Sequence, residues 1–342
     1  MDAVAKNKKR VRRVFAVLAI LLLVFFILDL AQAFIPLSFV DALQALFGIG
    51  SRTNVYIVQQ QNLPRAIMAC LVGAGLGVAG AVMQALFRNP MASPYILGLS
   101  SGAALGAAIG ITIPFAFVPM KLMTPLLAFI FCIGTLFLVY SISHVAGRVP
   151  TETLLLAGIA VGSFLSALVS FLIYVAGDQM SGIVNWTMGN MTASWREGEV
   201  FIVAPLMFAG CLVMLSCSRD LNAMMLGDAH ALDLGVEVRK VRLLLLFASA
   251  LVTAAAVSFV GVIGFVGLVV PHILRIVMGP DNRALLPASI LGGATFLLMC
   301  DYLSRIIVPS IGIIPIGIVT ALIGAPYFIY LLRRRRSEIG WD

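Results

Sequence analysis

The chain has 342 residues, of which 61% are hydrophobic and only 11% are charged, and its net charge is +8. Its mean hydropathy of +1.07 excludes an ordinary soluble domain. Apolar runs long enough to cross about 30 Å of hydrocarbon recur along the chain. They must be helical because lipid offers no hydrogen-bond partner for open backbone groups. The sequence therefore predicts an all-α, polytopic membrane protein.

Ten spans account for nearly the whole chain, so residues 1–342 are predicted to form a single transmembrane domain. The expected spans, in chain order, are 14–35, 65–87, 94–113, 122–143, 154–176, 199–217, 243–262, 265–278, 285–304 and 315–332. A basic tail, 1–13, precedes the first span, and a second tail, 333–342, follows the last. The apolar stretch after the first tail is too long for a signal peptide and lacks a small-residue cleavage site, which favours a retained span.

The distribution of Lys and Arg predicts the orientation. With ten spans, 18 of the 23 basic residues lie on the side of the two termini and five on the other side. The positive-inside rule then places both termini in the cytoplasm. We attribute the net positive charge to the basic residues that set the orientation in the membrane and contact lipid headgroups, and we expect no nucleic-acid partner.

A polar segment at residues 219–242, RDLNAMMLGDAHALDLGVEVRKVR, interrupts the apolar pattern between spans six and seven. Gly227 and Gly235 punctuate it, which predicts two short helices with Asp220 and Asp228 as plausible N-caps. Such a structured cytoplasmic element is a candidate docking surface.

Few residues here are typical of catalysis. No Walker A motif occurs, since none of the five lysines follows a suitable glycine, so the chain has no ATP site of that type. The three histidines are far apart, and the five cysteines fall within or at the ends of spans without metal-ligand spacing. We therefore expect neither an enzyme nor a metal site.

Charged residues inside the spans are sparse. Asp29 and Asp301 are the candidates there, and with Glu152 they leave open an ion-coupled secondary carrier. Arg305, one turn after Asp301, offers a structural ion pair instead, which we favour. Eight glycines in the second and third spans, between Gly73 and Gly110, predict closely packed helices.

Several motifs then resemble one family. They include LPRAIMACLVGAGLGVAGAVMQALFRNPMASPYILGLSSGAALG (63–106), LLLAGIAVG (154–162), WTMGNM (186–191), GFVGLVVPHILRIVMGPDNRALLPASILGGA (264–294) and PIGIVTALIGAPYFIYLLRRR (315–335). The chain resembles the FecCD-type, or BtuC-like, permease subunits of ABC importers for iron–siderophores, haem and vitamin B12. The resemblance covers nearly everything after residue 50.

The resemblance implies a type II ABC importer permease fold in the cytoplasmic (inner) membrane of a prokaryote. It further implies a homodimer with two cytoplasmic ATPase subunits and one extracytoplasmic substrate-binding protein, working by alternating access. ATP and Mg would be used by the ATPases, and no cofactor is expected on this chain. The expected cargo is a ferric siderophore or haem, with cobalamin as the alternative. A receptor or scaffold without transport remains a rival reading.

The resemblance also implies roles for individual residues. ATPase coupling falls on Leu221, Asn222, Leu226, Gly227, Asp228, Ala229, Leu234 and Gly235, with Leu221, Met224, Met225 and Leu232 as an apolar face. Binding-protein docking falls on Arg52, Arg65 and Arg305, whereas Arg196 and Lys121 are read as interfacial anchors. The cytoplasmic gate falls on Asn89, Met91, Thr151 and Glu152. The translocation path for the cargo is expected between the two copies, along the fifth and tenth spans and the short helix after the fifth. Glu152, and Ile313 where many members carry Glu, depart from the family pattern.

Overall fold

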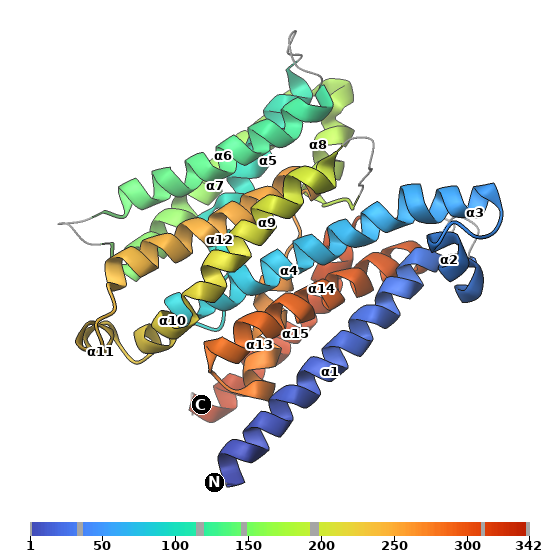
Figure 1. Ribbon diagram of the computed structural model, residues 1–342. Helices are drawn as coiled ribbons and strands as arrows, with labels where there is room; N and C mark the ends of the chain where they lie inside the picture. The colour runs from blue at the N-terminus through green and yellow to red at the C-terminus, as the bar shows by residue number, and fades with distance from the viewer. Residues whose placement is uncertain are drawn as a thin grey trace.

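The computed structural model describes residues 2–32, 37–113, 120–144, 149–191, 198–308 and 312–339, and within these ranges the secondary structure is entirely helical (Figure 1). In chain order the helices are α1 (Asp2–Ala31), α2 (Phe39–Leu46), α3 (Arg52–Tyr56), η1 (Ile57–Asn62), α4 (Leu63–Leu86), η2 (Pro94–Leu97), α5 (Leu99–Thr112), α6 (Met120–Ile142), α7 (Thr151–Val175), η3 (Gly177–Gln179), α8 (Met180–Thr187), α9 (Glu199–Ser216), α10 (Ser218–Met225), α11 (Asp228–Asp233), α12 (Val238–Val260), α13 (Val266–Met278), α14 (Asn282–Ile306) and α15 (Ile316–Ile339). The predicted all-α class is confirmed.

Ten of these helical stretches correspond to the ten predicted spans. Seven are long and apolar enough to cross a membrane, namely Lys8–Ala31, Arg52–Leu86, Leu122–Ile142, Thr151–Val175, Glu199–Ser216, Val238–Val260 and Asn282–Ile306. Three shorter apolar helices, Leu99–Thr112, Val266–Met278 and Ile316–Leu331, complete the set.

The ends of several spans differ from the expected ones. The third span does not run unbroken from 94, because Gly98 adopts φ 74° and separates the 3₁₀ turn η2 from α5. At the carboxyl end, α15 continues to Ile339, so much of the predicted tail 333–342 extends the last helix. The first tail likewise forms the start of α1.

Helix α4 lies at the centre of the packing, with α9, α12, α13 and α14 around it. Glycine allows this: a Cβ on Gly73 or Gly77 would overlap backbone of α14, and one on Gly80 would overlap Gly267 of α13. Backbones that approach this closely gain dispersion contacts, which drive packing where lipid removes the hydrophobic advantage. The expectation drawn from the glycine-rich second span is met at these contacts.

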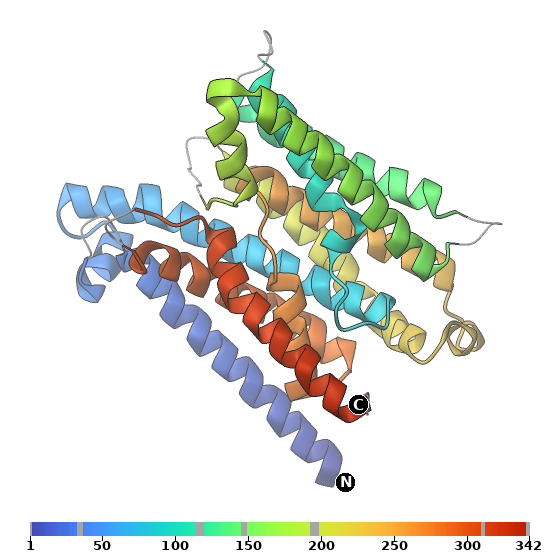
Figure 2. The same cartoon turned by 180° about the vertical axis from the view of Figure 1, so that it is seen from behind.

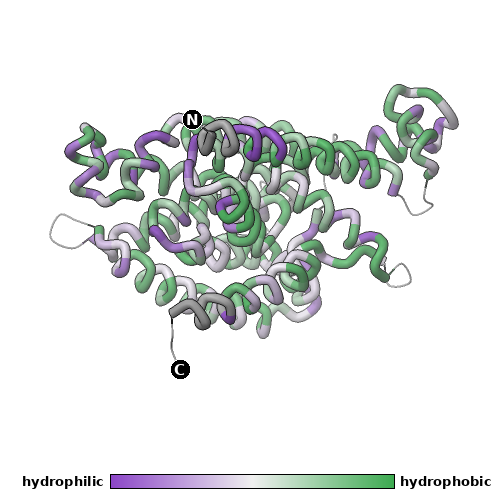
Figure 3. The backbone as a smooth tube through the Cα atoms, turned by 90° about the horizontal axis from the view of Figure 1, so that it is seen from below, coloured by the Kyte–Doolittle hydropathy of each residue, from purple (hydrophilic) through white to green (hydrophobic). Residues whose placement is uncertain are grey.

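The start of α1 and the end of α15 lie at one end of the molecule, together with α10 and α11 (Figures 1 and 2). The helices α2, α3 and α8 lie at the other end. Viewed from the terminal end, the coloured part of α1 is hydrophilic nearer the N-terminus and turns hydrophobic along its length (Figure 3). The arrangement agrees with an even number of spans, and the positive-inside rule assigns the terminal end to the cytoplasm.

Candidate docking surfaces and translocation path

The polar segment folds into the two predicted short helices, α10 and α11. Gly227, with φ 127°, separates them, and Gly235, with φ 83°, follows α11. The N-cap prediction is wrong for both aspartates, because the cap positions are Cys217 and Gly227 and neither helix has a side-chain cap. The Asp228 carboxylate makes ion pairs instead.

Those ion pairs attach α11 to two other helices. Arg88, just after α4, donates to Asp228 Oδ1 at 2.6 Å, and Arg242 of α12 donates to Asp228 Oδ2 at 2.7 Å. Arg88 also donates through Nε and Nη2 to the Met224 carbonyl at the end of α10, at 3.1 and 2.7 Å. A cation at the carboxyl end of a helix is favourable because the free carbonyls carry partial negative charge.

Asn222 attaches α10 to a third helix. Its Nδ2 donates to Asp281 Oδ1 at 2.7 Å, and its Oδ1 accepts from the backbone and side-chain nitrogens of Asn282, both at 2.8 Å. Asp281 is the N-cap of α14. Motion of α10 and α11 would be transmitted to α4, α12 and α14 through the contacts of Arg88, Arg242 and Asn222.

The apolar face of the segment differs from the expected one. Leu221 and Met224 are buried inside this chain, where α10 packs on α4 and α14. Leu232, also expected on that face, is 60% exposed, and the other exposed leucines are Leu226 and Leu234, at 71% and 67%. Ala229 is exposed beside them. These three exposed leucines of one short cytoplasmic element are here called the leucine patch, because exposed apolar side chains grouped in one element suit contact with a partner.

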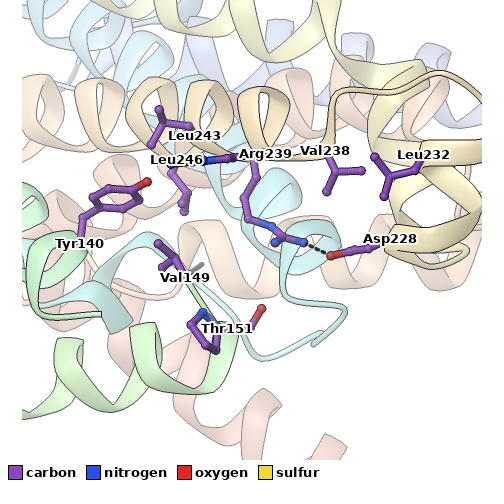
Figure 4. Close-up of a pocket in the computed structure, with 11 residues that line it drawn as sticks. Tyr140, Val149, Thr151, Asp228, Leu232, Val238, Arg239, Leu243 and Leu246 are labelled. Carbon is purple, nitrogen blue, oxygen red and sulfur yellow. Dashed lines mark hydrogen bonds and ion pairs between the residues drawn. The ribbon is translucent and has the colours of Figure 1, made fainter. Parts of the chain in front are cut away.

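A pocket of about 710 Å³ lies beside the leucine patch, between α11, α12 and the start of α7. Figure 4 shows Tyr140, Thr151 and Asp228 among its walls, with the ion pair of Asp228 as a dashed line. The predicted gate residue Thr151 therefore lies next to the coupling element. Its neighbour Glu152 is exposed in the first turn of α7, where a carboxylate complements the positive end of the helix dipole.

The other two predicted gate residues, Asn89 and Met91, lie in a separate pocket of about 530 Å³. Asn89 Oδ1 accepts from the Met91 backbone nitrogen at 3.0 Å, which holds the turn between α4 and η2. Side chains from four segments line this pocket: Gln84, Arg88, Asn89, Pro90, Met91, Met225, Leu268, His272, Arg275, Ile276, Phe328 and Leu331. Within one copy of the chain, Thr151 thus lines the first pocket, Asn89 and Met91 line the second, and Glu152 lines neither of the two.

Two of the three predicted docking arginines are buried in a charged cluster between α1, α4 and α14. Arg65 donates to both carboxylate oxygens of Asp301 at 2.8 Å. Arg305 pairs with Asp301 at 3.1 Å and with Asp29. The two arginine side chains are 11% and 7% exposed, and both aspartates are fully buried. The predicted Asp301–Arg305 ion pair is confirmed.

The charged cluster also closes the end of α1. Arg305 Nη1 donates to the Gln32 carbonyl at 2.7 Å, and Asn62 Nδ2 donates to the carbonyls of Leu30 and Gln32 at 2.8 and 3.1 Å. These donors satisfy carbonyls that a helix end leaves free. The geometry therefore gives Arg65 and Arg305 a structural role, and meeting a binding protein would require their ion pairs to open.

Arg52 differs from the other two because its side chain is exposed at the start of α3. Ile313, where many members of the resembled family carry Glu, is 56% exposed. Arg196 lies outside the described residues, and so does the side chain of Lys121. Of the outer arginines described, Arg52 is the one placed to contact another protein.

The expected path helices α7 and α15 keep large apolar side chains on their surfaces. Tyr174 and Phe164 of α7 are 86% and 63% exposed, and Leu322 of α15 is 66% exposed. Both helices face the viewer in Figure 2, with α8 at the outer end of α7. Within the described residues, no group of three or more His, Cys, Asp or Glu could hold a metal ion.

Comparison with known proteins agrees with this architecture. The model of the FecCD transport family matches residues 21–334. The cobalamin import system permease protein BtuC of Halobacterium salinarum is 44% identical over 290 residues, covering 84% of this chain and 76% of that protein. The hemin transport system permease protein HmuU of Yersinia pestis is 41% identical over 281 residues, covering 81% and 83%.

A solved structure matches almost the full length. It is an inward-facing conformation of an ABC transporter assigned to the metal-chelate type, 33% identical, with a TM-score of 0.82 and coverage of 94% of this chain and 99% of that one. The predicted type II importer permease fold is confirmed by this match. The chain is a non-catalytic, multi-pass permease subunit of an ABC importer in the cytoplasmic membrane of a prokaryote. By its family match and by these relatives, the chain belongs to the FecCD transport family.

Proposed function

We propose that two copies of this chain form the pathway of an importer that carries a metal chelate, a ferric siderophore or haem, by alternating access. Two ATPase subunits would dock on α10 and α11, and a substrate-binding protein would deliver the cargo to the outer face. ATP and Mg would be used by the ATPases, with no cofactor on this chain. Cobalamin is the alternative cargo, since similar permeases are named for cobalamin and for hemin.

The leucine patch is the observation that carries the proposal. Leu226, Leu232 and Leu234 are more than half exposed on the cytoplasmic side, whereas the element that bears them is tied to α4, α12 and α14. An apolar patch that is held rigidly and surrounded by charge suits docking to a protein partner. Closure of the ATPases on ATP binding would pull on those three helices through the same contacts.

An ion-coupled carrier has less support. Such a carrier needs carboxylates that bind and release the coupling ion along the path. Asp29 and Asp301 are instead bound to Arg305 and Arg65 within a buried cluster. Of the three candidates, only Glu152 is exposed, and it lies at the start of α7.

The test is to replace Leu232 by Glu in the full-length permease, produced together with its ATPase. We expect the ATPase to be lost on purification, because a carboxylate in the centre of an apolar contact is costly to desolvate. The matched control is Leu43→Glu, an exposed leucine of α2 at the outer end. Normal ATPase recovery and normal ATP-driven uptake with L232E would contradict the proposal.

A further inference from the structure

The pocket beside Asn89 and Met91 has an amphipathic lining that the proposed function does not explain. Met91, Met225 and Phe328 supply apolar walls, and Arg275 of α13 supplies charge. Its volume of about 530 Å³ is in the range of small-molecule sites. Because the pocket adjoins α10 and the expected gate, it lies at the cytoplasmic end of the molecule.

The charge of the pocket is positive. Its described lining residues include two arginines and neither Asp nor Glu. The guanidinium of Arg88 already has partners, because it donates to the Met224 carbonyl and forms an ion pair with Asp228. Arg275 has no ion pair among the described residues, and its Nη1 faces only the weak acceptor Met225 Sδ at 3.8 Å.

Arg275 also has an unsatisfied donor. Its Nη2 is buried and lacks a hydrogen-bond partner within the described part of the chain. A guanidinium held in this way is costly unless water or an anion reaches it. The pocket provides room for either, because one water needs only about 30 Å³.

Gln84 adds an acceptor to the same pocket. Its Nε2 donates to the Leu268 carbonyl at 3.0 Å, which orients the amide and leaves Oε1 buried without a partner. The pocket therefore offers a cation, a neutral acceptor and apolar walls. A ligand that matches this set is an organic anion with carboxylate oxygens and a hydroxyl group.

We infer that this pocket binds a carboxylate, or a similar oxyanion, of the transported chelate as it leaves toward the cytoplasm, and that Arg275 is its charged contact. The inference rests on the proposed import function and narrows its cargo to chelates that carry exposed anionic oxygens. Arginine suits this contact because its planar fork can pair with two oxygens of one carboxylate.

The test uses citrate, a hydroxycarboxylate, as the probe. The intact transporter is placed in nanodiscs of neutral phosphatidylcholine, and the Kd for radiolabelled citrate is measured without ATP. We expect saturable binding that Arg275→Gln weakens at least tenfold and Arg275→Lys weakens less. The matched control is Arg283→Gln, which removes an exposed cytoplasmic arginine outside the pocket and should leave the Kd unchanged.

Three results would overturn the inference. Citrate does not bind in neutral nanodiscs, or it binds equally well to R275Q, or the pocket instead retains phosphatidylglycerol in an Arg275-dependent manner. The last result would make it a lipid-headgroup site. A failure of the proposed function would be seen in a different experiment, as an absence of ATP-driven transport by the unmodified complex. The citrate measurement is made without ATP and does not depend on transport.

Discussion

Arg65 and Asp301 are 236 positions apart in the sequence and share two hydrogen bonds of 2.8 Å, one to each carboxylate oxygen. The pair joins the start of α4 to the end of α14, and Arg305 extends it to Asp29 of α1. Two arginines and two aspartates balance in charge, so the cluster can remain buried where a single ion could not. It fixes the outer ends of three helices relative to one another.

Replacing Asp301 by Asn should therefore destabilise the permease strongly. The change leaves Arg65 without a charged partner and Arg305 with Asp29 alone, and breaking a buried pair costs about 3–5 kcal/mol. The measurement is the thermal unfolding midpoint of the purified permease in detergent. The control is Asp178→Asn, an exposed carboxylate of η3. Equal midpoints for D301N and the unmodified protein would show that the cluster contributes little.

Arg52 and Arg65 should respond differently to charge reversal. Arg52→Glu is expected to weaken the binding of the cognate binding protein about tenfold, because the new carboxylate would repel acidic side chains of that partner. It should not lower the unfolding midpoint, because the side chain of Arg52 is exposed. Arg65→Glu should lower the midpoint, because it opposes Asp301. Surface binding and thermal unfolding of both variants separate the two effects. Unchanged binding with R52E would remove Arg52 from the docking surface.

The ten spans were predictable because hydropathy depends on local composition, and the Asp301–Arg305 pair was predictable because the two residues are one helical turn apart. The Arg65–Asp301 pair was not, since only the packing of α4 on α14 brings these residues together. The inward direction of Leu221 was missed for the same reason. The contacts of Arg88 were not predicted either. Its φ of 47° lies in a region that favours glycine, yet its guanidinium donates to the Met224 carbonyl and to Asp228.

Reversing the charge of Asp228 should uncouple the ATPase from transport. In D228R, Arg88 and Arg242 would repel the new side chain, so α11 would lose its connections to α4 and α12. We expect ATP hydrolysis to persist while substrate moved per ATP falls about tenfold, measured with proteoliposomes that contain the complete transporter. Adding Arg242→Asp restores one attractive pair and should recover part of the coupling. Normal coupling in D228R alone would show that these ion pairs do not transmit motion.

Gly80 should tolerate no side chain at all. A Cβ at this position would overlap the carbonyl group of Gly267, and backbone on α13 cannot move aside as the end of a flexible side chain can. Gly80→Ala is therefore expected to separate α4 from α13 and to cost at least the 1–3 kcal/mol typical of overpacking. Gly134→Ala is the matched control, because nothing lies within 4 Å of its Cβ. Alanine also favours a helix by about 1 kcal/mol over glycine, so the control should unfold at an equal or higher temperature. A G80A permease as heat-stable as the G134A control would mean that α4 and α13 are not packed as closely as their backbones indicate.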